Sequence, residues 1–186
     1  FDASKFPSKI DSLTGNGFQF TNTNRVFTKY PYGTALLQSP FFLLAHGSAP
    51  LLNQDQSGYS PVYHWATNIA AAFYATLGLW MLYLFLASQF PKLAATITTV
   101  LILLGSGVYY YTVTDGGMSH IYSFAMFAAT LRLMQVSRFY TTPNRIITLF
   151  KIGALCGILL AIRPTHLIFI LFTPFIFSTS WDRVIA

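Results

Sequence analysis

The chain has 186 residues, of which 54% are hydrophobic and only 9% are charged, and its formal net charge is +6. Soluble domains carry about 25% charged residues, so this composition excludes an ordinary soluble domain and favours an integral membrane protein. The basic residues are scattered between apolar runs and form no basic face, which argues against nucleic-acid binding. Every acidic residue is an Asp, so chemistry that needs a pair of Glu side chains is excluded within these residues.

The N-terminal part, residues 1–62, is expected to form an extracytoplasmic loop. Residues 1–25 are polar and show no period of two or 3.6, which is typical of a loop. The apolar segment at about 34–48 contains Pro40 and is too short to cross a bilayer comfortably, so an interfacial or re-entrant helix is expected there. A true crossing is the alternative, and it would move residues 1–30 to the cytoplasmic side. Because the chain begins at Phe1 without a signal sequence and ends just after an apolar run, we expect an internal piece of a longer membrane protein.

Five apolar runs follow, and each is interpreted as a transmembrane helix, because helices satisfy their backbone polar groups internally in lipid. The final run is broken by Arg163-Pro164-Thr165-His166, since proline disfavours helix at the residue before it. The fold class is therefore all-α, a polytopic transmembrane helix bundle with a short interfacial helix in the first outer loop. The expected spans are residues 65–87, 93–113, 119–136, 146–162 and 167–180.

The distribution of charge predicts the orientation of these helices. With the Lys92 turn in the cytoplasm, that side carries six basic residues and one Asp, a net charge of +5. The other side carries five basic residues and four Asp, a net charge of +1. The positive-inside rule therefore places the Asp115 loop and the Arg163 break on the extracytoplasmic face. Unusual polar residues that meet on one face of a membrane protein indicate a site there.

Four stretches of the sequence resemble a known family. They are "KYPYGTALLQSPFFLLAH", "GYSPVYHWATNIAAAFYATLGLWML", "SHIYSF" and "AIRPTH". They resemble bacterial polytopic glycosyltransferases of the GT-C superfamily, and are similar to protein mannosyltransferases (glycosyltransferase family 39) and lipid A aminoarabinose transferases. The resemblance covers roughly residues 29–171, most of the chain.

The resemblance implies an enzyme that takes a sugar from a polyprenyl-phosphate carrier and passes it to an extracytoplasmic acceptor. It also implies juxtamembrane helices in the first outer loop, as expected for residues 34–48, and a catalytic acid early in that loop. Asp2 is the acid nearest the start of the chain, and no matching motif surrounds it, so we expect that catalytic acid to lie upstream of this piece. Such transferases often need no metal, and the lipid-linked sugar donor is a substrate, so no cofactor is expected.

Two groups of residues are the main candidates for a site. Asp115 and His120 flank a Gly-Gly turn and are candidate catalytic residues, because a carboxylate beside an imidazole is suited to acid–base chemistry. The alternative is a polar loop tip before a helix, with Ser119 as its N-cap. Arg163 suits a lipid phosphate, with Thr165 and His166 beside it; the alternative is an arginine that reaches the lipid headgroups.

Three further residues, Lys29, Tyr30 and Tyr59, are expected to help bind the substrate, with anchoring at the membrane interface or a structural role as the alternative. The four histidines lack metal-ligand spacing, so no metal site is expected.

The sequence therefore predicts an integral membrane glycosyltransferase in the bacterial inner membrane, with membrane lipid and a polyprenyl-phosphate sugar as its partners. A non-enzymatic transporter or an envelope-assembly subunit stays open as the alternative. An acidic motif directly after a first transmembrane helix would favour the enzyme, and an inverted repeat of these helices would favour the transporter.

Overall fold

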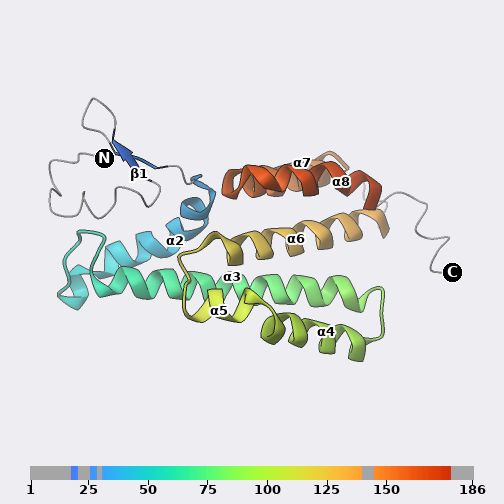
Figure 1. Cartoon of the computed structure of the whole chain (residues 1–186), viewed down its shortest axis with the longest axis horizontal. Coiled ribbons are helices and arrows are strands. Elements are labelled where there is room, and N and C mark those ends of the chain that lie inside the picture. The colour runs from blue at the N-terminus through green and yellow to red at the C-terminus, as the bar shows by residue number, and fades with distance from the viewer. Residues whose placement is uncertain (1–17, 21–25, 29–30, 140–144, 177–186) are drawn as a thin grey trace. The chain divides into compact units, whose positions relative to one another are not determined.

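The computed structural model describes residues 18–20, 26–28, 31–139 and 145–176, shown as ribbon in Figure 1. The chain forms two compact units, Phe1–Tyr32 and Gly33–Ala186. In the first unit, β1 (Phe18–Phe20) pairs antiparallel with β2 (Val26–Thr28). The expectation of a loop throughout this segment is wrong here, because strands of three residues are too short to show an alternating pattern.

The described part of the second unit is entirely helical, which confirms the all-α fold class for it. Each expected helical range begins within four residues of the start of an observed helix, and each except the last ends within four residues of the end of an observed helix. Residues 177–180 of the last range lie outside the described residues. The α-helices are α2 (Gly33–Ser48), α3 (Pro61–Ala87), α4 (Lys92–Gly105), α5 (Gly107–Val113), α6 (Ser119–Phe139), α7 (Arg145–Ile162) and α8 (Leu167–Ile176). Short 3-10 turns lie at Pro50–Leu52 and Pro164–His166.

Membrane-crossing length and hydropathy are found in fewer helices than the sequence predicted. Among the described residues, α3 alone is a single helix that is long and apolar enough to cross a bilayer. α4 and α5 reach that length together, but they are bent by 59°. The expectation of one unbroken span at 93–113 is therefore wrong. The bend falls at Gly105-Ser106-Gly107, and glycine and serine pairs are common sites of helix kinks.

The core of the second unit lies where α3 and α6 pack side by side (Figure 1). Small residues let the two backbones approach closely. A Cβ atom added at Gly78 would lie 2.8 Å from the Phe124 ring and 3.0 Å from Ala125 Cα. The buried residues of this interface are Ala70, Tyr74, Ala75, Ile121, Tyr122, Ala125 and Met126.

α2 runs antiparallel to α3 along the first half of that helix. The Tyr74 hydroxyl donates to the Leu37 carbonyl near the start of α2, at 3.1 Å. Near the end of α2, the Tyr63 hydroxyl lies 2.8 Å from His46 Nδ1. α2 therefore packs lengthwise on the first half of α3.

Candidate functional site

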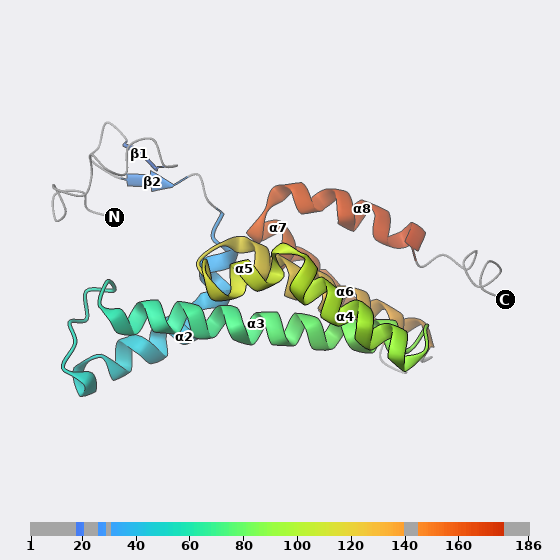
Figure 2. The ribbon, with the colours of Figure 1, turned by 60° about the horizontal axis from the view of Figure 1, so that its bottom comes forward.

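The α5–α6 loop and the break between α7 and α8 meet at one end of the helix bundle (Figures 1 and 2). The loop carries Asp115 and leads into Ser119 and His120 at the start of α6. The break begins at Arg163, whose backbone is extended directly after α7. Two segments more than 40 residues apart in the sequence thus supply the candidate residues.

Arg163 connects the two segments. Its Nε donates to Ser119 Oγ at 2.9 Å, and its Nη2 lies 3.4 Å from His120 Nε2. A guanidinium has five N–H donors and no acceptor, so His120 Nε2 must accept, and the proton of the neutral imidazole lies on Nδ1. Neither partner is a carboxylate, and the remaining N–H groups of the half-buried Arg163 are suited to an oxyanion.

The His120 ring is fixed by its neighbours. Tyr111, from α5, stacks on the imidazole with ring centroids 4.2 Å apart and planes inclined by 26°. The structure therefore brings Ser119 and His120 against the Arg163 guanidinium, and Asp115 lies in the loop that leads into Ser119.

The α5–α6 loop is held by a buried tyrosine that the sequence analysis missed. Tyr122 is fully buried, and its hydroxyl donates to the Gly116 carbonyl while accepting from Gln38 Nε2, both at 2.9 Å. Gly116 is also close to α3, since a Cβ atom there would lie 2.9 Å from Ala71 Cβ. Gln38 is a polar residue within an apolar helix, and that was the available signal for a buried hydrogen bond.

A buried hydroxyl lies one helical turn from Ser119. Ser123 is 6% exposed, and its Oγ has no hydrogen-bond partner among the described residues. Residues four apart share a face of a helix, so Ser119 and Ser123 lie on the same side of α6. Buried polar atoms are normally paired, so Ser123 Oγ is an exception among the described residues.

The other predicted site residues lie elsewhere or have other roles. His166 donates from Nδ1 to the Leu159 carbonyl at 2.9 Å and packs edge-on against Phe127, so it closes the end of α7. Thr165 is exposed in the same turn. Tyr59 is exposed in the connector before α3, whereas Gly116 approaches α3 further along, at Asn68 and Ala71. Lys29 and Tyr30 lie outside the described residues.

No group of three or more His, Cys, Asp or Glu side chains suited to a metal ion occurs in the described part of the chain. Comparison with protein-family models, with curated proteins and with solved structures found no match to this chain.

The Tyr122→Phe substitution is expected to lower the free energy of unfolding by about 1–3 kcal/mol, because it leaves the Gly116 carbonyl without its donor. The ring packing against Tyr74 is preserved, so the loss reports the hydroxyl alone. Thermal unfolding in detergent measures the effect. Tyr110→Phe is the matched control because that ring is 53% exposed. Equal midpoints for both variants would show that the hydroxyl does not hold the loop.

Proposed function

We propose that the protein is an integral membrane glycosyltransferase that moves a sugar from a polyprenyl-phosphate donor to an extracytoplasmic acceptor. The observation that carries the proposal is the position of the Arg163 guanidinium, beside Ser119 and His120 and next to the Asp115 loop. The apolar composition and the membrane-crossing length of α3 support a membrane location. In this proposal the chain forms a bundle of about five spans in the bacterial inner membrane.

Arg163 is proposed to bind the phosphate of the donor. Planar guanidinium groups bind phosphate oxygens through paired N–H donors, and this geometry adds specificity to the charge attraction. Ser119 fixes the guanidinium through Nε and leaves most of the other N–H groups for the ligand. When the bond between sugar and phosphate breaks, negative charge grows on the phosphate, and a fixed cation stabilises it.

Asp115 is proposed to act as the base. The acceptor hydroxyl attacks the anomeric carbon of the sugar, the bond from that carbon to the phosphate oxygen breaks, and the hydroxyl proton passes to the Asp115 carboxylate. His120 accepts from Arg163 through Nε2, so its role is to orient the guanidinium while its Nδ1–H remains a donor. Tyr111 holds the imidazole plane in that position.

Binding of polyprenyl phosphate to the protein in lipid nanodiscs tests the phosphate site without knowledge of the sugar. We expect saturable binding by the wild type, strong loss in Arg163→Ala, and partial retention in Arg163→Lys, which keeps the charge but loses the planar fork. Lys151→Ala is the control, because Lys151 is an exposed cation of α7 near the other end of that helix. Equal binding by Arg163→Ala and Lys151→Ala would remove Arg163 from the proposed site.

A further inference from the structure

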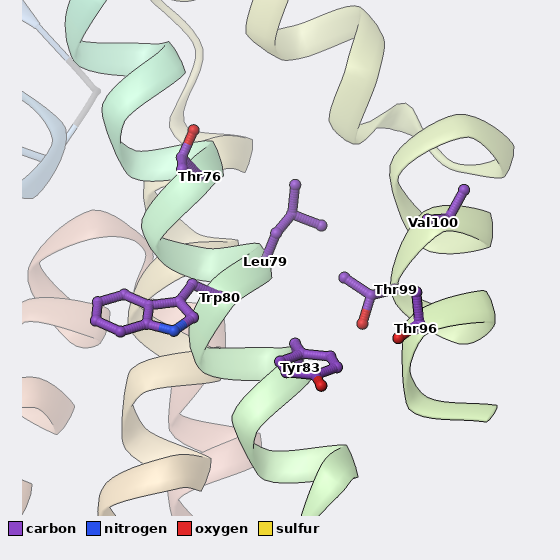
Figure 3. A pocket seen from close by; sticks show the side chains of 7 residues that line it. All are labelled: Thr76, Leu79, Trp80, Tyr83, Thr96, Thr99 and Val100. Carbon is purple, nitrogen blue, oxygen red and sulfur yellow. The ribbon is translucent and has the colours of Figure 1, made fainter. Parts of the chain in front are cut away.

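We propose that a groove between α3 and α4 binds one hydrocarbon chain of a membrane lipid. The groove has a volume of about 370 Å³, within the range of ligand pockets. Leu79 from α3 and Thr99 from α4 point toward one another across it (Figure 3). The remaining lining residues are Thr76, Trp80, Tyr83, Thr96 and Val100.

The threonines make the walls more apolar than the residue types indicate. Each of the three hydroxyls donates to a carbonyl one turn earlier in its own helix, at 2.8 Å for Thr76 and Thr99 and 2.9 Å for Thr96. Their donors are therefore already used, and the methyl groups remain as contact surface. A polar ligand would lose its hydrogen bonds to water without gaining these donors, whereas a hydrocarbon chain loses nothing.

The position of the groove indicates the source of that chain. α3 is the helix of membrane-crossing length, and α4 belongs to the bent pair that reaches this length with α5. Large apolar side chains around the groove are exposed, among them Trp80 at 58% and Leu101 at 63%. An exposed apolar surface on helices of this kind is covered by lipid, so an acyl chain of a neighbouring lipid is the occupant that fits the groove.

This inference is independent of the sugar-transfer proposal, because the groove lies along α3 and α4 and contains none of the candidate site residues. The test uses the protein in vesicles of phosphatidylcholine that include a phosphatidylcholine with a photoreactive diazirine on one acyl chain. After illumination, mass spectrometry maps the lipid adducts. We expect adducts on the half-buried Leu79 and Tyr83 as well as on the outward Leu101.

Two variants that fill the groove from opposite walls make the test specific. Thr99→Phe and Thr76→Phe should each strongly reduce the adducts on Leu79 and Tyr83, while adducts persist on Leu93, an outward residue of α4 that is 72% exposed. Leu101→Phe is the matched control on α4 and should leave the groove adducts unchanged. If only outward residues are labelled in the wild type, and Leu79 and Tyr83 are not, the groove is filled by protein and the proposal is overturned. Groove adducts that persist in both filled variants would overturn it as well.

Discussion

Replacing Arg163 with alanine is expected to reduce sugar transfer by about 10²- to 10³-fold, the usual effect of removing one fixed donor to a developing negative charge. Arg163→Lys should lose less transfer activity, because it keeps the positive charge. It should still lose some activity, because a lysine cannot bond Ser119 and the phosphate in one plane. The measurement is the initial rate of transfer from a radiolabelled polyprenyl-phosphate sugar in membranes that contain equal amounts of each variant.

The effect of this substitution must be separated from a loss of folding. Lys151→Ala removes an exposed positive charge from α7, the helix that precedes Arg163, and should transfer at the wild-type rate. Ser119→Ala should show an intermediate loss, because it frees the guanidinium that Ser119 otherwise holds through Nε. Wild-type transfer by Arg163→Ala, with unchanged thermal stability, would contradict the role given to the guanidinium.

Replacing Gly33 with alanine is expected to cost several kcal/mol of stability and is the largest structural effect predicted here. The added Cβ atom would overlap Ala161 C and Ile162 N, which are backbone atoms of α7. Backbone cannot move aside as a side chain does, so α2 and α7 would have to separate; overpacking of this kind costs about 1–3 kcal/mol or more. Thermal unfolding measures the loss.

Gly47→Ala is the matched control, because Gly47 lies in the same helix and a Cβ atom there would meet nothing within 4 Å. Alanine is the better helix former by about 1 kcal/mol, so this control should be neutral or stabilising. Because Ala161 and Ile162 directly precede Arg163, Gly33→Ala should also displace the Arg163 side of the site. Equal unfolding midpoints for the two variants would show that the close contact between α2 and α7 is not required.

The helices were predictable from the sequence because long apolar runs, interrupted by glycine, proline and charge, define them. The break at Arg163 is one example: Pro164 disfavours helix at the residue before it, and the structure ends α7 at Ile162. The meeting of Arg163 with the Asp115–His120 segment also follows from connectivity, since successive antiparallel helices bring alternate loops to the same end of a bundle.

The sequence did not predict the contacts that hold the site together. The Tyr122 hydroxyl bonds and the stacking of Tyr111 on His120 depend on how the helices rotate about their axes, and an all-apolar helix carries little information about rotation. The bend between α4 and α5 was missed because the run is apolar on both sides of Ser106. His166 resembled a site residue in the sequence because it lies in the Arg163 break. Its bond to the Leu159 carbonyl depends on the geometry of that turn, which the sequence does not show.

The most direct test of the proposed function is incubation of membranes containing the wild-type protein with a panel of radiolabelled polyprenyl-phosphate sugars. The proposal predicts that label leaves the carrier for an acceptor with at least one sugar, and that Arg163→Ala reduces this transfer by about 10²- to 10³-fold. If the wild type binds the carriers but no label leaves any of them, the result would contradict a transferase and favour a transporter or an envelope-assembly subunit.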